Sequence, residues 1–139
     1  MRFSNETFCR ISVYEWKALR GAPHKIIRHP NMPRGVFHLL WECLGRSTPV
    51  GGYVQNLSKD GTHYWVFAVM VPTDDGYLSV RLKPLGPRLT RISKLYLDLR
   101  RRELDDDISP QESANALLDA LKKDGSKSYQ HFMVTALNE

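Results

Sequence analysis

Residues 56–66 read NLSKDGTHYWV, and this stretch decides the fold. Asp60-Gly61 at its centre tolerates the positive φ angles that a tight hairpin turn needs. Residues 53–57 before the turn and residues 63–71 after it have the length and the aromatic and β-branched content of strands. The second segment is apolar at both alternations, as in a strand that is covered on both faces. The stretch therefore predicts an antiparallel β-hairpin.

The segments around this hairpin add one more strand and several helices. Residues 73–76, TDDG, predict a second turn, and residues 77–82 a third strand. Upstream, short helical turns are expected over residues 1–20 and a structured loop, broken by Gly and Pro, over residues 20–35. The apolar positions that follow recur at helical spacing and predict a short amphipathic helix ending near Gly45: Val36, Phe37, Leu40, Trp41 and Leu44. Three antiparallel strands after short helices indicate an α+β fold.

Past Pro87 the sequence is helical. Leu89, Ile92, Tyr96 and Leu99 form a short heptad-like seam. Residues 109–112, SPQE, form a helix start with a Ser cap, and residues 129–137 predict a final amphipathic helix. We therefore expect a domain over residues 1–86, a connecting helix over 87–104 and a helical hairpin over 108–139. The seam either pairs in a homodimer or folds back over the sheet.

Composition limits the function classes. The chain has 139 residues, enough for one domain, with 42% hydrophobic and 25% charged residues. No apolar run approaches the roughly 18 residues of a membrane-spanning helix, and no signal peptide is evident, so we expect a cytoplasmic protein. Two cysteines outside any CxxC pair suit a reducing compartment. The net charge of +5 permits an anionic ligand or nucleic acid, but acidic residues interrupt the basic ones of residues 88–107, which favours a solvated helix face.

Catalytic and metal-binding motifs are missing from the sequence. It contains no GxSxG, P-loop, HExxH or GxGxxG pattern. The five histidines have no standard metal spacing, and the acidic pairs at residues 74–75 and 105–107 fall in turns, where carboxylates are usually solvated. We do not expect an enzyme.

Three segments together resemble a known family. They are residues 28–33 (RHPNMP), the hairpin stretch 56–66 and residues 76–81 (GYLSVR). Their combination is similar to the flavin-binding PAS sensor domain of bacterial aerotaxis receptors, over about residues 3–81. The resemblance implies an antiparallel sheet with short helices over one face, enclosing a cleft that holds FAD without a covalent bond. The cofactor's redox state would then drive signalling.

The resemblance also implies a shortened N-terminus. In this family two strands precede the position of Asn5, so the first strand and most of the second are expected to be missing. The strand over residues 77–82 would then have an open edge, which proteins rarely leave exposed. A partner chain, the C-terminal helices or an upstream segment would cover it.

Six positions match the family's cofactor site: Asn5, Arg28, His29, Trp41, Asn56 and Trp65. The chemistry of these side chains suggests their roles: Arg28 and His29 could hold the pyrophosphate, Trp41 offers an apolar wall, and Asn56 can match the polar edge of the isoalloxazine.

Five of these positions also have a purely structural alternative. The two tryptophans could be core residues and Asn56 could satisfy the turn, while Arg28 could pair with Glu42 and His29 could brace its loop.

These expectations lead to two functional interpretations. The favoured one is a soluble PAS sensor that binds FAD and reports redox or oxygen state to a signalling partner protein, as a homodimer and without membrane or nucleic-acid binding. The alternative is a cofactor-free PAS-like module for dimerisation or docking.

Overall fold

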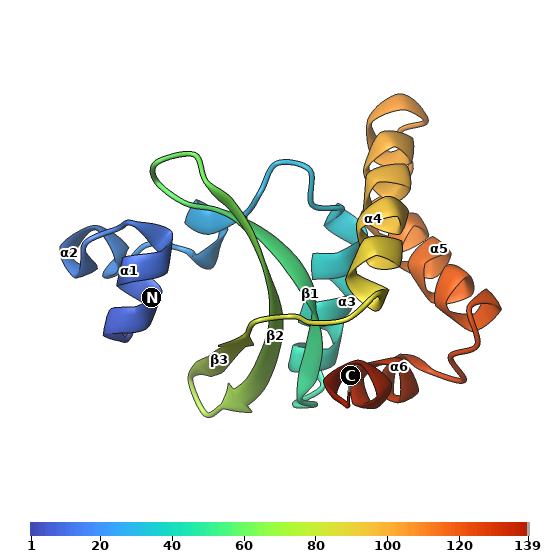
Figure 1. Ribbon diagram of the computed structural model, residues 1–139. Helices are drawn as coiled ribbons and strands as arrows, with labels where there is room; N and C mark the ends of the chain where they lie inside the picture. Colours follow the sequence, from blue (N-terminus) through green and yellow to red (C-terminus); the bar gives the residue numbers. More distant parts are fainter. Residues whose placement is uncertain (139) are drawn as a thin grey trace.

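A three-stranded antiparallel sheet in the order β1-β2-β3 forms the centre of the protein, in a computed structural model that describes residues 1–138 (Figure 1). The strands are β1 (Val50–Leu57), β2 (His63–Thr73) and β3 (Gly76–Leu82). The helices are α1 (Glu6–Ser12), α2 (Trp16–Leu19), the 3-10 helix η1 (His24–Ile27), α3 (Arg34–Gly45), α4 (Arg88–Asp105), α5 (Pro110–Lys123) and α6 (Tyr129–Leu137). The predicted α+β fold is confirmed.

The two hairpins form where the turn residues predict them. Gly61 has a φ of +88°, and Asp60 accepts a hydrogen bond from the backbone N–H of Thr62 at 3.0 Å. However, β1 begins at Val50, three residues before the predicted start. The sequence hides this part of the strand because it contains Gly51 and Gly52, which have low strand propensity. Side chains from β2 and α6 approach these two glycines so closely that a Cβ would come within 2.9 Å of them.

Helices lie on both sides of the sheet (Figure 1). On one face, α3 reaches the strands through Leu40, and η1 lies beside it. The opposite face carries α4 and α6: the Tyr96 hydroxyl donates to the Tyr53 carbonyl at 2.9 Å, and the Tyr53 ring lies 6.1 Å from that of Phe132. The C-terminal helices therefore cover the face that the predicted short helices leave open.

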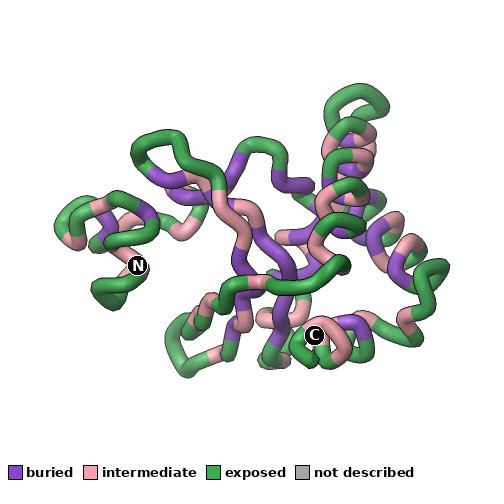
Figure 2. The backbone as a smooth tube through the Cα atoms, in the orientation of Figure 1, coloured by how far each residue is buried: buried purple, intermediate pink, exposed green. Residues whose placement is uncertain are grey.

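The apolar seam of α4 is used inside the chain. Ile92, Tyr96 and Leu99 are buried in the hydrophobic core, as the purple segments of Figure 2 show for this part of the helix. Of the two predicted uses of the seam, the structure has the one in which the helix returns to cover the sheet. A homodimer through Ile92 would need this packing to open.

α5 joins α3 by a close helix contact. It begins with the predicted capping box of Ser109 and Glu112. Opposite its first turn stands Gly35 of α3, where a Cβ would lie 2.6 Å from the backbone nitrogen of Ala114. α6 instead packs on β1, where the Tyr129 hydroxyl donates to the Gly51 carbonyl at 2.7 Å. The predicted division into residues 1–86, 87–104 and 108–139 stays a prediction.

The N-terminal helices lie on the side of the sheet away from α4 and α6 (Figure 1). An exposed ion pair between Arg2 and Asp75 links the first residues to the turn before β3. Among residues 1–138, no helix is both long and apolar enough to cross a membrane.

Candidate functional site: a cationic cavity beside the sheet

A small cavity of about 40 Å³ lies between η1, α3 and the sheet. Strand alternation places its polar groups together. Tyr77, Ser79 and Arg81 point from β3 to the same face, and Asn56 reaches that face from β1. α3 contributes Phe37 and Trp41, one helical turn apart, on the stripe that the sequence predicts as apolar. The cavity therefore combines arginine, amide and hydroxyl groups with aromatic walls.

Arg28 enters the cavity from the loop that follows η1. Its backbone bridges that of Asn56 at the edge of β1, and its guanidinium carbon lies 3.6 Å from the centre of the Phe37 ring. Its Nε is buried and has no hydrogen-bond partner. Burial lowers the pKa of Arg28 from its ordinary value. The predicted alternative is a surface pair with Glu42, but the ion pairs of Glu42 in the described chain are with His38 at 3.9 Å and Arg46 at 3.5 Å.

Arg81 is the second cation of the cavity. With the Asn56 amide oriented so that its nitrogen donates to the Ile27 carbonyl at 3.3 Å, its oxygen accepts from Arg81 Nη1 at 3.1 Å. Burial lowers the pKa of Arg81, while the nearby Tyr64 and Tyr77 act in the opposite direction. No Asp or Glu is among the described residues that line the cavity. Two desolvated guanidinium groups therefore share it without a carboxylate.

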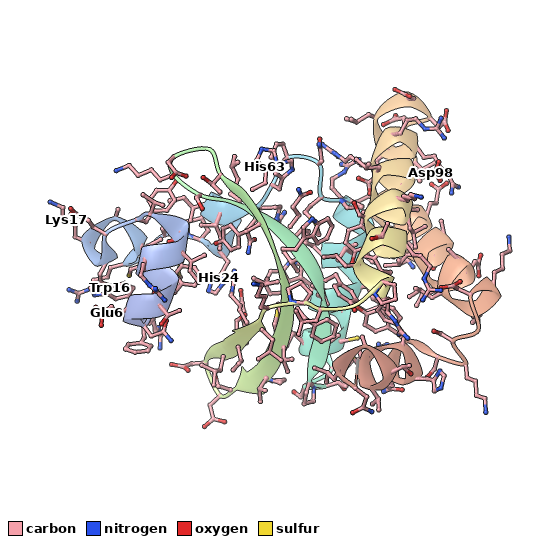
Figure 3. The ribbon with its side chains drawn as sticks, in the orientation of Figure 1. Glu6, Trp16, Lys17, His24, His63 and Asp98 are labelled. Atoms are coloured by element: carbon pink, nitrogen blue, oxygen red, sulfur yellow. The ribbon has the colours of Figure 1, made fainter. Side chains whose placement is uncertain are left out.

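The mouth of the cavity is aromatic. The Trp41 and Tyr77 rings meet edge to face at 5.3 Å, and His24 packs against Tyr77 at 5.1 Å. Trp41 is 44% exposed, so it is less buried than a core residue on this stripe would be. Burial, followed by the charge of Arg81, lowers the pKa of His24 to about 4, which leaves the imidazole neutral at pH 7. Figure 3 shows His24 in the space between α1 and the sheet.

The six predicted site residues do not all meet. Arg28, Trp41 and Asn56 line the cavity, whereas His29 and Trp65 line a second hollow of about 120 Å³ under α4, on the opposite face. Asn56 and Trp65 separate because Trp65 pairs across the sheet with residue 55, and consecutive residues of a strand face opposite ways. Asn5 lies in neither hollow.

Asn5 instead caps α1: its Oδ1 accepts from the Phe8 N–H at 2.9 Å. This contact satisfies one of the free backbone donors at the start of the helix. Its role in binding a cofactor stays a prediction, as do the roles of the other five positions.

The second hollow contains a histidine pair that sequence spacing did not reveal. His29 Nε2 lies 3.1 Å from Nδ1 of His63, which follows 34 residues later. His29 Nδ1 accepts from the Asn31 N–H at 3.0 Å, so its proton is on Nε2, which donates to His63. A metal ligand would need that nitrogen free. In the described part of the chain, no group of three or more His, Cys, Asp or Glu residues could hold a metal ion.

Sequence reasoning also missed Arg81, Ser79 and Tyr77. They belong to the quoted GYLSVR segment, and the alternation of that strand could have placed them beside Asn56. Phe37 was also missed: it shares the predicted stripe with Trp41, but that stripe alone does not indicate that it faces Arg28 and Arg81.

Comparisons with known proteins agree with this architecture. The PAS fold family matches residues 2–80. The aerotaxis receptor of Escherichia coli (strain K12) is 37% identical over 98 residues, which are 67% of this chain and 19% of the receptor. The chain thus spans about a fifth of that relative's length.

Solved structures with this fold include two LOV domains. The light state of the blue-light photoreceptor Aureochrome1 LOV has a TM-score of 0.54 at 16% identity, over 65% of this chain and 74% of that one. The LOV domain of the Erythrobacter litoralis EL346 blue-light activated histidine kinase has a TM-score of 0.51 at 18% identity, over 58% of this chain and 82% of that one. With the family match over more than half of its residues, the chain belongs to the PAS fold family.

Proposed function

We propose that this PAS sensor domain binds a flavin, specifically FAD, in the cationic cavity and reports the flavin's redox state to a signalling partner protein. The observation that carries the proposal is the pair of desolvated guanidinium groups, Arg28 and Arg81, with no carboxylate among the cavity's lining residues. Both arginines are partly buried, and a partly buried cation without a counter-ion carries a desolvation cost that an anionic ligand would offset.

The groups in the cavity fit the chemistry of a flavin nucleotide. Arg28 and Arg81 would hold the pyrophosphate by charge-assisted hydrogen bonds. Beyond its bonds to Ile27 and Arg81, the Asn56 amide keeps a second N–H and a second oxygen lone pair for the polar edge of the ring. The buried Nε of Arg28 and the buried hydroxyl of Ser79 have no partners, so both remain available to a ligand. A bound flavin would supply reversible electron and proton uptake, which the side chains of this chain do not provide.

The cavity must open to admit a flavin, because its present volume is small. Ligand pockets usually measure roughly 300–1,000 Å³, whereas this cavity measures about 40 Å³. Trp41 and Tyr77 close the mouth by a single edge-to-face contact, and Trp41 is half exposed. We expect these two rings to swing outward when the flavin enters.

The same small volume favours the second candidate function. A cofactor-free docking module needs no ligand-sized cavity, and about 40 Å³ is far below the usual size of a ligand pocket. Under this alternative, Arg28 would be retained for its contact with the Phe37 ring, and the purified protein would be colourless.

The relatives support a sensor on the level of the family. The E. coli relative is an aerotaxis receptor, and the two structural neighbours are the LOV domains of a blue-light photoreceptor and of a blue-light activated histidine kinase. By analogy we propose a cytoplasmic, non-enzymatic signalling domain that acts on a protein partner, as a homodimer and without binding membrane or nucleic acid. The two cysteines, Cys9 and Cys43, are unpaired, as expected in a reducing compartment.

The test starts with the visible absorption spectrum of the purified chain. A yellow protein that bleaches with dithionite and releases FAD on heating supports the proposal. A folded, colourless protein that does not take up added FAD contradicts it and leaves the cofactor-free module.

Matched variants locate the site. Arg28→Gln and Arg81→Gln should each weaken FAD binding by tenfold or more, because a hydrogen bond to a charged group contributes about 1.5–3 kcal/mol. Arg46→Gln removes the same charge from an exposed position at the end of α3 and should leave binding unchanged. Equal affinity in all three variants would place the flavin elsewhere.

A further inference from the structure

The loop between η1 and α3 reaches both faces of the sheet. It comprises residues 28–33, and we call it the cavity loop. Arg28 points into the cationic cavity, while the next residue, His29, is buried on the opposite face against His63. The carbonyl of Pro30 then accepts a hydrogen bond from Arg100 Nε of α4 at 3.2 Å. A displacement of this short loop would therefore move Arg28 in the cavity and change the contact with α4 at the same time.

The far end of the cavity loop is held by Glu103, near the end of α4. Its carboxylate accepts from the backbone N–H groups of Arg34 at 2.9 Å and Gly35 at 3.0 Å, which begin α3. Pro33, the residue before α3, supplies no side-chain cap. The first turn of α3 is thus capped by a carboxylate that comes 68 residues later in the chain. Carboxylates suit this place because free N–H groups and the helix dipole both favour negative charge.

Glu103 is in its charged form at this position. Its side chain is completely shielded from solvent, and Arg100 Nη1 donates to it at 3.2 Å. Burial acts to raise the pKa of Glu103, but the N–H groups of Arg34 and Gly35, the Ser113 hydroxyl and the guanidinium of Arg100 outweigh burial and lower it. The contact is therefore a charged network between α3, the cavity loop and α4.

The start of α3 determines where the cavity walls stand. Phe37 lies within the first turn after the capped residues, and Trp41 follows one turn later. The other end of the cavity loop positions Arg28 through its backbone bridge to Asn56. A carboxylate outside the cavity therefore fixes one end of the segment that binds the ligand, and the bridge to Asn56 fixes the other.

We propose that Glu103 is a positioning residue for the cationic cavity, so that packing of α4 on the cavity loop and binding of a flavin in the cavity are coupled. The proposal rests on the proposed function, and it adds that the redox signal leaves the cavity through Glu103 and α4. Coupling between two sites is reciprocal: if α4 favours the bound state, then the ligand must stabilise α4 by the same factor.

The test compares Glu103→Gln with Asp98→Asn, which removes a carboxylate from an exposed position of the same helix. We expect Glu103→Gln to weaken FAD binding about tenfold and Asp98→Asn to leave it unchanged. In the wild type, added FAD should slow hydrogen exchange at Arg34, Gly35 and the last turns of α4, and this protection should be lost in Glu103→Gln. If Glu103→Gln does not fold, Arg100→Gln, which removes the contact with Pro30, replaces it.

The outcomes separate this proposal from the proposed function. If the wild type and Glu103→Gln bind FAD equally, the coupling is refuted while the flavin site stands. If the wild type binds no FAD, the proposed function fails. Amide hydrogen exchange of the ligand-free proteins then decides whether Glu103 positions the cavity loop. Faster exchange over residues 28–35 in Glu103→Gln, with α1 unchanged, then supports it, and unchanged exchange over residues 28–35 overturns it.

Discussion

Replacing Gly35 with alanine tests the contact between α3 and α5. The new Cβ would lie 2.6 Å from the backbone nitrogen of Ala114 and the carbonyl carbon of Ser113, and it would also meet the Ser113 hydroxyl. Ordinary contacts of a Cβ are 3.4–4 Å, so the helices would have to separate by about 1 Å. Because the obstacle is backbone, no side-chain rotation relieves it.

The expected loss of stability is the sum of two costs less one gain. Overpacking costs about 1–3 kcal/mol, and weakening of the Gly35 N–H bond to Glu103 costs about 1 kcal/mol more. The higher helix propensity of alanine stabilises the folded state by about 1 kcal/mol. We therefore expect Gly35→Ala to lower the free energy of unfolding by about 2 kcal/mol.

Gly45→Ala is the matched control. Gly45 ends the same helix, and a Cβ there meets nothing within 4 Å, so this variant should gain about 0.5 kcal/mol from propensity alone. Urea unfolding followed by circular dichroism gives the free energy of unfolding of both variants. An unchanged dependence of this free energy on urea concentration shows that only the stability has changed. A Gly35→Ala protein as stable as the wild type would refute the close packing of α3 and α5.

Three further predictions concern single side chains. Tyr96→Phe should cost about 1–3 kcal/mol in the same unfolding assay, since the Tyr53 carbonyl loses a buried donor, and an unchanged midpoint would contradict the bond. Because the pKa of His24 is about 4 when folded and 6.5 when unfolded, the unfolded state takes up the proton first, so His24 should contribute stability above pH 6.5 that is lost as the pH falls towards 4. His24→Phe should therefore flatten stability between these pH values, and an equally steep profile would argue against burial of the neutral imidazole. Asn5→Ala should cost about 1 kcal/mol by removing the cap of α1, visible as faster amide exchange at Phe8, whereas unchanged exchange would show that the cap does not hold the helix.

The sequence predicts the fold where local chemistry decides it. The Asp60-Gly61 turn and the Ser109 capping box need only a few neighbouring residues, and the structure has both. Gly51 and Gly52 hid the start of β1 because their place in the strand depends on side chains from β2 and α6. Such contacts cannot be obtained from a propensity.

The candidate site was predictable only in part. Arg28, Trp41 and Asn56 followed from the family resemblance, and they line one cavity. His29 follows Arg28 directly but faces the other way, since this segment runs alongside β1 and consecutive residues of extended chain face opposite ways. Glu103 gave no signal, because a glutamate after three arginines is typical of a solvated helix end, and its partners come 68 residues earlier.

Because Glu103 of α4 caps the start of α3, the order of synthesis and the choice of fragment both affect the cavity. During synthesis, the first 86 residues emerge while the carboxylate that completes α3 is still unmade, so the wall carrying Phe37 and Trp41 should stay frayed until α4 arrives. A fragment that ends at residue 86, just after the sheet, would then have a poorly ordered cavity wall. Ligand screens and crystallisation trials on this protein should therefore keep the C-terminal third.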